Sequence, residues 1–188
     1  MKVLVTGATG YIGSHVCKLL KQHGHHVTAW DINFWGEHND IRGYCDHFLT
    51  FDVTKEVSGE FDAVVHLAGR SLVGPSTETP SEYYRVNIAG TANLLNRVQT
   101  DHVLFASTSS AWEMASPYAR SKVAAEDVIK EHASGYTIFR FFNVSGTDGT
   151  NRQLGPPSHL IKIAAMAAAG KIPQIEIYGT DYPTRDGT

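Results

Sequence analysis

Three glycines between a strand-like segment and a helical pattern constrain the fold of this chain more than any other feature. The apolar run Lys2–Thr6 predicts a strand, and the helical stripe of Tyr11–Gln22 predicts a helix. Between them, Gly7 permits a tight turn, Gly10 lets backbone approach a pyrophosphate, and Gly13 lets helix pack on strand. A dinucleotide phosphate would then lie at the positive end of the helix. A simple turn without a ligand is the alternative interpretation.

Strand-like and helical segments alternate along the rest of the chain, which is typical of a parallel sheet with helices on both faces. The expected strands are His26–Asp31, Phe48–Phe51, Ala63–Leu67, Val103–Ser107, Thr137–Phe142 and a short Ile175–Tyr178. The expected later helices are Pro80–Val98, Pro117–His132 and Pro156–Ala169. We therefore predict an α/β, doubly wound, Rossmann-like domain over residues 1–143 and the beginning of a small C-terminal substrate-binding cap over residues 144–188.

The composition argues against several classes of partner. The 188 residues carry a formal charge of −3 without a basic run, so neither nucleic acid nor an anionic membrane is an expected partner. The start lacks a signal-peptide pattern, and no stretch reaches the roughly 20 apolar residues of a spanning helix. Cys17 and Cys45 form no metal or disulfide pattern, and His23–His26 predicts a solvated turn rather than a metal site. We expect a cytoplasmic protein without a metal.

Acidic and small residues follow the other strand ends. Asp31 closes the second expected strand, where a carboxylate accepts hydrogen bonds from ribose hydroxyls and repels a 2′-phosphate, so NAD is favoured over NADP. An ordinary solvated aspartate is the alternative. Asp52 and Val53 follow the third strand and would meet the adenine, unless Asp52 only caps the segment from Thr54 onward. His66 fits a packed, hydrogen-bonded core histidine better than a base, and small residues after it let backbone approach a cofactor.

Tyr118 and Lys122 form a Tyr-x-x-x-Lys pair inside the expected helix Pro117–His132. Residues four apart share one helix face, so the ammonium can lie close to the phenol. A nearby positive charge favours phenolate and predicts a pKa of Tyr118 below its usual value of about 10. Such a tyrosine is a general acid/base for a sugar or alcohol hydroxyl, and a dinucleotide on the glycine turn would accept the hydride.

Taken together, these motifs resemble the extended short-chain dehydrogenase/reductase family, most closely its nucleotide-sugar 4-epimerases. The resemblance extends over almost the whole chain, through the segments Val3–His15, His66–Gly69, Tyr83–Asn87, Ser116–Lys122, Arg140–Asn143 and Tyr178–Thr184. It implies NAD as the cofactor, a UDP-hexose as the substrate, and interconversion of UDP-glucose and UDP-galactose through a 4-keto intermediate. A homodimer that pairs through the helices Pro80–Val98 and Pro117–His132 is also implied.

The resemblance assigns roles residue by residue. Tyr118 would be the acid/base, Lys122 would hold the nicotinamide ribose and lower the tyrosine pKa, and Thr108 would hydrogen-bond the reacting hydroxyl. The resemblance implies that Tyr118 and Lys122 contact the cofactor, as do the three glycines of the turn and the acids Asp31 and Asp52. The other implied cofactor contacts are Tyr11, Ile12, Val53, Leu67, Ala68, Gly69, Ser71, Asn87, Ser107 and Phe142. Implied substrate contacts are Thr108, Tyr118, Asn143, His159, Leu160, Glu176 and Tyr178.

Departures from the family pattern limit what the resemblance implies. Dehydratases of the family carry Asp-Glu directly after the catalytic threonine, whereas Ser109 and Ser110 follow Thr108, which disfavours dehydration. The segment between Thr108 and Tyr118 is shorter than in the family, and the family's diphosphate-binding arginine would come after Thr188. Three functions remain open: a UDP-hexose epimerase, another nucleotide-sugar enzyme such as a reductase or decarboxylase, and a non-catalytic NAD-binding module.

Overall fold

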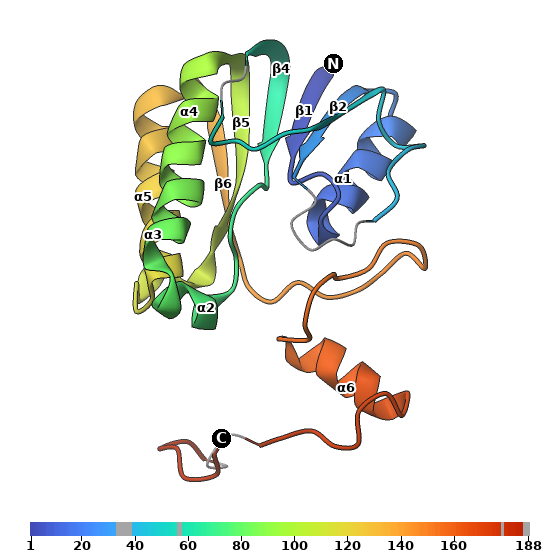
Figure 1. Cartoon of the computed structure of the whole chain (residues 1–188), viewed down its shortest axis with the longest axis vertical. Coiled ribbons are helices and arrows are strands. Elements are labelled where there is room, and N and C mark those ends of the chain that lie inside the picture. The colour runs from blue at the N-terminus through green and yellow to red at the C-terminus, as the bar shows by residue number, and fades with distance from the viewer. Residues whose placement is uncertain (33–38, 56–57, 178, 186–188) are drawn as a thin grey trace. The chain divides into compact units, whose positions relative to one another are not determined.

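The computed structural model describes residues 1–32, 39–55, 58–177 and 179–185, and its chain divides into two compact units, Met1–Leu154 and Gly155–Thr188. In the described part of the first unit, six parallel strands form one sheet in the order β3-β2-β1-β4-β5-β6 (Figure 1). The strands are β1 (Lys2–Thr6), β2 (His26–Asp31), β3 (His47–Thr50), β4 (Gly59–His66), β5 (Val98–Thr108) and β6 (Tyr136–Phe141). This order confirms the predicted doubly wound, Rossmann-like sheet.

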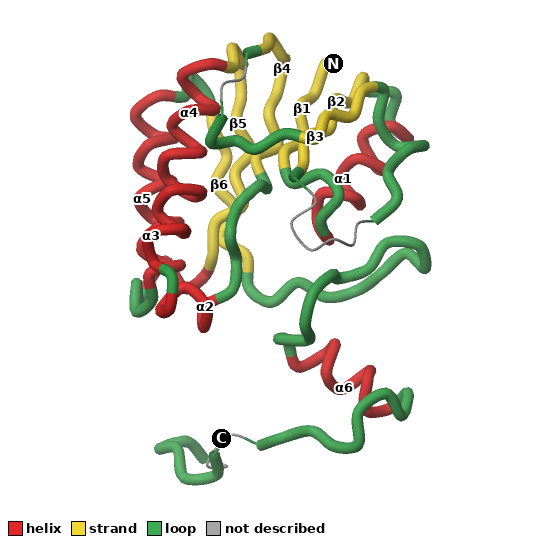
Figure 2. The backbone as a smooth tube through the Cα atoms, in the orientation of Figure 1, coloured by secondary structure: helices red, strands yellow, loops and turns green. Residues whose placement is uncertain are grey.

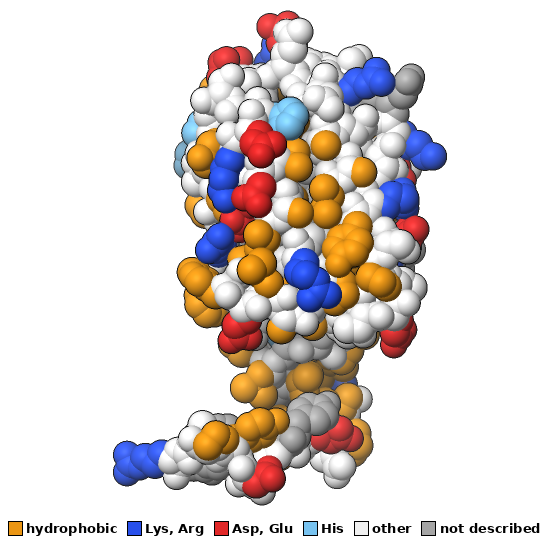
Figure 3. All heavy atoms as spheres, turned by 90° about the vertical axis from the view of Figure 1, so that its left-hand side faces the viewer, with side chains coloured by type: hydrophobic (Ala, Val, Ile, Leu, Met, Phe, Trp, Pro, Cys, Tyr) orange, Lys and Arg blue, Asp and Glu red, His pale blue; other side chains and the backbone are white. Residues whose placement is uncertain are grey.

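Helices lie on both faces of this sheet (Figures 1 and 2). Because successive side chains of a strand point to opposite faces, Val3 and Val5 pack with Cys17 on one face, while Leu4 packs with Leu94 on the other. The helices of the first unit are α1 (Tyr11–Gln22), α2 (Val73–Glu78), α3 (Pro80–Tyr83), α4 (Gly90–Arg97) and α5 (Pro117–His132), with a π-helical turn at Tyr84–Ala89 and a 3₁₀ turn at Ser109–Trp112. Figure 3 looks onto the outer side of the α4–α5 layer, where apolar side chains lie among charged ones.

Several element bounds differ from those expected from the sequence. β5 begins at Val98 rather than at residue 103, because its first residues pair with Gly59 and the residues that follow it in β4. The expected helix over 80–98 is interrupted by the π-helical turn. The expected strand over 175–178 is wrong as far as it is described, since residues 175–177 form no strand and Tyr178 lies outside the described residues. A strand needs a neighbour for its backbone hydrogen bonds, and the described part of the second unit offers none.

The second unit contains α6 (Leu160–Ala168), which begins four residues after the expected start at Pro156. No residue of α6 is buried, and Lys162 Nζ donates to the carbonyl of Gly155 at 3.0 Å. Residues 144–154 belong to the first unit, so the structural division falls later than residue 143. The functional division into a cofactor-binding domain and a cap after residue 143 stays a prediction. Among the described residues, no helix combines the length and apolarity that crossing a membrane requires.

Candidate active site

At Gly7 and Gly13, on either side of the turn between β1 and α1, the backbone is packed so closely that there is no room for a side chain. A Cβ atom on Gly13 would lie 2.1 Å from the carbonyl oxygen of Gly7, and Gly7 itself has a φ of +69°. Helix α1 begins at Tyr11 without a side-chain cap and without an acidic residue in its first turn. Its first N–H groups are therefore available to an anion, as the pyrophosphate of a dinucleotide requires.

The loop after β4 lies between this turn and α5, the helix that carries Tyr118 and Lys122. A Cβ on Gly7 would lie 2.8 Å from the backbone nitrogen of Ala68, so the loop rests directly on the glycine turn. One residue further, a Cβ on Gly69 would lie 2.9 Å from Asn87 Oδ1 and 3.8 Å from Lys122 Nζ. The predicted cofactor residues of this loop thus lie between the glycine turn and the predicted catalytic lysine.

A buried chain of hydrogen bonds runs behind this loop. His66 Nδ1 lies 2.7 Å from Thr6 Oγ1, and His66 Nε2 lies 2.9 Å from Thr91 Oγ1. Because the Thr91 hydroxyl donates to the carbonyl of Asn87 at 2.6 Å, it must accept from Nε2–H, which leaves Nδ1 as the acceptor from Thr6. Burial, followed by the charge of Lys122, lowers the pKa of His66 to about 3. The prediction of a packed, hydrogen-bonded core histidine is confirmed.

Asn87 lies in the π-helical turn and joins the loop after β4 to α5. Its Oδ1 accepts from the Arg70 N–H at 2.8 Å, and its Nδ2 donates to the Arg70 carbonyl at 3.0 Å and to Ser121 Oγ at 2.9 Å. Ser121 Oγ in turn donates to the carbonyl of Tyr118 at 2.7 Å. π-Helical turns often occur at functional sites, and this one places its asparagine between the two halves of the candidate site.

Tyr118 stands in the first turn of α5, which begins where the sequence predicted. The Ser116 side chain caps this helix by accepting from the Ala119 N–H at 3.1 Å, and the Tyr83 ring lies edge-on to that of Tyr118 with the centroids 6.4 Å apart. Burial raises the pKa of Tyr118 above its usual value, and hydrogen bonding to Thr108 offsets only part of this. The phenol is thus protonated at neutral pH.

Lys122 does not produce the predicted lowering of the Tyr118 pKa. The lysine is 5% exposed, and its ammonium lies 4.0 Å from the centroid of the Phe105 ring. Burial lowers the pKa of Lys122 to about 7, against an opposing effect of Glu126. The prediction is wrong because burial acts on both groups: it favours the neutral phenol and it weakens the positive charge that was expected to counter it.

The acidic residues predicted to contact the cofactor have different partners. Asp31, at the end of β2, accepts from the N–H of Thr9 at 2.9 Å, so its carboxylate is held at the glycine turn. Asp52 Oδ1 accepts from the N–H of Thr54 at 2.9 Å, so this carboxylate does cap the segment that follows it. Val53 is buried beside it. Cofactor contacts by these residues stay predictions.

Other predicted contacts lie at the margins of the site or in the second unit. The Tyr11 hydroxyl donates to the carbonyl of Gly146 at 2.5 Å, and Ile12 lines the same groove between α1 and residues 144–148. Ser71 and Asn143 are exposed, and Phe142 is 76% exposed. Three expected substrate contacts belong to the second unit and stay predictions: His159, Leu160 and Glu176. A fourth, Tyr178, lies outside the described residues.

Sequence reasoning missed Glu126 and its partners. This α5 carboxylate is 1% exposed and accepts hydrogen bonds from the side chains of Ser107 and Arg140. Ser107 had been assigned a cofactor contact, which stays a prediction, but its hydroxyl is engaged with Glu126. The available signal was an acidic residue one turn after Lys122, with the apolar residues Val123 and Ile129 three positions before and after it on the helix.

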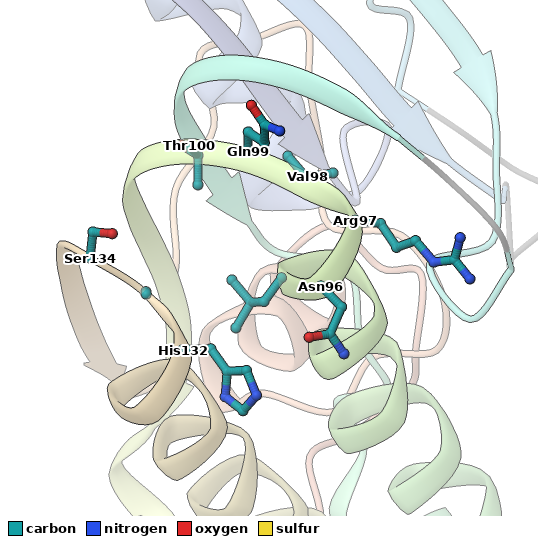
Figure 4. Close-up of a pocket in the computed structure, with 9 residues that line it drawn as sticks. Asn96, Arg97, Val98, Gln99, Thr100, His132 and Ser134 are labelled. Atoms are coloured by element: carbon teal, nitrogen blue, oxygen red, sulfur yellow. The ribbon is translucent and has the colours of Figure 1, made fainter.

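A separate cavity of about 350 Å³ lies at the opposite end of the sheet, where β5 begins and α4 and α5 end (Figure 4). The side chains of Asn96 and His132 lie beside it, whereas Arg97 points away. Because the candidate site lies at the carboxyl ends of the strands, this cavity belongs to the other edge of the fold. Within the described ranges, no three His, Cys, Asp or Glu side chains are grouped so that they could hold a metal ion.

Comparisons with known proteins agree with this geometry. The chain is 33% identical to the UDP-glucose 4-epimerase of Corynebacterium glutamicum, in an alignment that covers 100% of this chain and 65% of the relative. The UDP-glucose 4-epimerase of Stenotrophomonas maltophila, solved with NAD and formylated UDP-arabinopyranose, is 30% identical, with a TM-score of 0.85 over 100% of this chain and 68% of that one. A structure of the NAD-dependent NDP-hexosamine 5,6-dehydratase TunA is 27% identical, with a TM-score of 0.80 over 95% and 65% of the two chains.

These relatives include both epimerases and a dehydratase. The chain spans less than two thirds of the length of the first curated relative. The family can still be assigned, because a family model matches nearly every residue of the chain. With residues 3–187 matched, the chain belongs to the NAD dependent epimerase/dehydratase family.

Proposed function

We propose that the chain binds NAD at the glycine turn and acts as a nucleotide-sugar 4-epimerase that interconverts UDP-glucose and UDP-galactose. The observation that carries the proposal is the loop after β4, which packs against Gly7 at one end and against Lys122 at the other. A cofactor laid along this loop from the glycine turn reaches the helix of Tyr118. The similarity to UDP-glucose 4-epimerases supports a UDP-hexose as the substrate.

Residues of the first unit have different roles in the proposed reaction. Tyr118 exchanges a proton with the sugar 4-hydroxyl, and Thr108 orients that hydroxyl. Lys122 supplies positive charge beside the tyrosine, and its pKa of about 7 means that this charge is only partly present at neutral pH. The glycine turn and Lys122 would hold NAD, which would supply a reversible hydride acceptor at this site. The buried chain from Thr6 to Asn87 keeps the loop and α5 in place.

Dehydration is the less favoured reaction for this site. In the resemblance described above, dehydratases carry an acid pair directly after the threonine. Ser109 and Ser110 occupy those positions and form a 3₁₀ turn, in which the Ser110 N–H donates to Thr108 Oγ1 at 3.2 Å. A carboxylic acid to protonate a leaving hydroxyl is therefore absent from this turn.

The test is proton NMR of the purified chain incubated with UDP-galactose, first without and then with added NAD. Appearance of the anomeric signal of UDP-glucose supports the epimerase. NAD binding without any conversion would instead favour the second candidate, a non-catalytic NAD-binding module. Formation of a dehydrated sugar would contradict the argument from Ser109 and Ser110.

We also propose a homodimer through the outer side of α4 and α5. Helices α4 and α5 carry partly exposed apolar side chains at Ala92, Val123, Ala124 and Val128, and an exposed acidic one at Asp127. On this side of the molecule, apolar and charged side chains lie next to one another (Figure 3). Small apolar residues permit close approach of helices from two subunits. Sedimentation equilibrium tests this, and a monomer at all concentrations would contradict it.

A further inference from the structure

Glu126 is a carboxylate in the interior, one helical turn after Lys122 on α5. Its Oε1 accepts from Arg140 Nε at 2.9 Å and its Oε2 from Arg140 Nη2 at 2.7 Å, while the Ser107 hydroxyl also donates to Oε1. Burial raises the pKa of Glu126, but the hydrogen bonds from Arg140 and Ser107 outweigh burial and leave this pKa below its usual value. The buried side chain is therefore a carboxylate anion.

The partners of Glu126 come from two neighbouring strands. Ser107 of β5 and Arg140 of β6 are register partners in the sheet, and Thr108 is the next residue of β5. One side chain of α5 thus contacts both strands immediately before the predicted catalytic threonine. Bidentate contacts between arginine and carboxylate fix orientation as well as supplying energy, so this contact sets how α5 lies on the two strands.

Further charges lie on the solvent side of Glu126. Lys130 Nζ is 3.7 Å from Glu126 Oε2 and 3.0 Å from Asp127 Oδ1. The Lys130 side chain is 41% exposed, so solvent screens its interaction with Glu126. Arg140 is the main cationic partner.

On its inner side, Glu126 acts on Lys122. The groups that surround this lysine are Tyr118 on its own helix, the neutral His66 of β4, and the Phe105 ring of β5 at 4.0 Å. The uncharged side chain of Asn87 and the backbone of Gly69 complete the surroundings. Among the described residues, Glu126 is the acidic group whose charge opposes the effect of burial on Lys122.

We propose that Glu126 is a positioning residue of the site: it clamps α5 to β5 and β6 beside Thr108, and its charge favours the cationic form of Lys122. The need for a cationic Lys122 rests on the proposed function, whereas the clamp and the effect on the lysine charge do not. Glu126 touches neither substrate nor cofactor in this role, because it acts through Ser107, Arg140 and Lys122.

The charge effect is large enough to measure because Lys122 titrates near neutrality. Side chains four residues apart on a helix have Cβ atoms about 5–6 Å apart, and Lys122 and Glu126 are both buried on α5. Because a nearby opposite charge shifts a pKa by roughly 1–3 units, loss of this anion is expected to lower the pKa of Lys122 by about one unit. At pH 7 the cationic fraction of Lys122 then falls about fivefold.

A ¹³C NMR titration of the NAD-free full chain, with lysine labelled at Cε, tests the proposal. The Lys122 resonance is assigned by its loss in Lys122→Met. Glu126→Gln keeps the size of the side chain and an acceptor for Ser107, and is expected to lower the pKa of Lys122 by about one unit. Adding Arg140→Met to this variant removes the charge that Glu126→Gln leaves unpaired. The Lys122 pKa of the double variant is expected between those of the wild type and the single variant.

Glu131→Gln is the matched control, because it makes the same chemical change at an exposed position of the same helix. It is expected to leave the Lys122 pKa unchanged. The same Lys122 pKa in the wild type and in both Glu126 variants would overturn the proposal, as would an equal shift in the control. If Glu126→Gln alone does not fold, the Lys122 pKa of the double variant is compared with that of the wild type instead, and an unchanged value would overturn the proposal. The titration needs no substrate or NAD, so its outcome is separate from that of the UDP-galactose experiment.

Discussion

The glycine turn after β1 and the first turns of the tyrosine–lysine helix α5 lie on either side of the loop after β4, but they are held in different ways. The turn is held by steric exclusion, since a Cβ on Gly13 would lie 2.1 Å from the Gly7 carbonyl oxygen. The helix packs on β5 through Ala125 and Ile129, and it also places charged side chains in the interior, with Lys122 5% exposed and Glu126 1% exposed. One region excludes side chains, and the other buries charged ones.

This difference determines how each region fails. A steric site is lost when any atom is added, whatever its charge. A site built from buried polar groups keeps its shape after a conservative substitution but changes its protonation, because each pKa depends on neighbouring charges and burial. Substitutions in the glycine turn are therefore expected to change stability, whereas conservative substitutions in the helix are expected to change chemistry.

The largest expected effect is on chemistry in the helix region. Tyr118→Phe removes the proton-transferring hydroxyl, and epimerase turnover is expected to fall about 10²- to 10⁴-fold. The ring and its packing against Tyr83 remain, so NAD binding and thermal stability are expected to change little. Turnover is followed by NMR, and NAD binding by calorimetry. Retained turnover would remove Tyr118 from the role of acid/base.

Gly13→Ala tests the steric region. The added methyl group cannot be accommodated beside the Gly7 carbonyl, so the free energy of unfolding is expected to fall by about 3 kcal/mol, with loss of NAD binding. Gly74→Ala is the matched control, because nothing lies within 4 Å of its Cβ. That variant is expected to change stability by less than about 1 kcal/mol in urea unfolding. Equal effects of the two substitutions would contradict the steric account.

The pH dependence of stability reports on the buried lysine. The pKa of Lys122 is lowered from 10.5 to about 7, so the unfolded chain binds more protons at this site above pH 7. Stability is therefore expected to rise with pH between 7 and 8.5, by at most about 1.4 kcal/mol per pH unit. At higher pH the buried Cys17 acts in the opposite direction, because its pKa is raised to about 12.

Lys122→Met provides the comparison for this pH dependence. Its urea unfolding free energy is expected to rise less than that of the wild type over the same pH range, because the titrating group is gone. Parallel curves for the two proteins would show that the lysine titrates normally in the folded state.

The smallest expected effect concerns cofactor choice. Asp31→Ala removes the carboxylate expected to bind the ribose hydroxyls, and the preference for NAD over NADP is expected to fall about tenfold, or 1.4 kcal/mol. Asp46→Ala is the control, because Asp46 also accepts a backbone N–H, that of Val27 at 2.7 Å, away from the glycine turn. Both variants lose some stability, but only the first is expected to alter the ratio of dissociation constants. An unchanged ratio would count against the ribose role of Asp31.

The sequence by itself determined the features that depend on local geometry. The glycine spacing identified the turn, since a missing Cβ is a property of the residue itself, and periodicity placed α5 at Pro117–His132 with the bounds that the structure shows. The doubly wound class of the fold also followed, because alternating strands and helices favour a parallel sheet with helices on both faces.

Only the tertiary structure decided the properties that depend on distant residues. β5 is longer than predicted because its first residues pair with β4. Residues 175–177 form no strand because the described residues offer them no pairing partner. The raised pKa of Tyr118 and the lowered pKa of Lys122 come from burial, which a spacing of four residues does not reveal. Glu126 meets Ser107 and Arg140 because the sheet brings β5 and β6 together beneath α5. Electrostatic effects in the interior depend on all surrounding groups, and the fold alone brings those groups together.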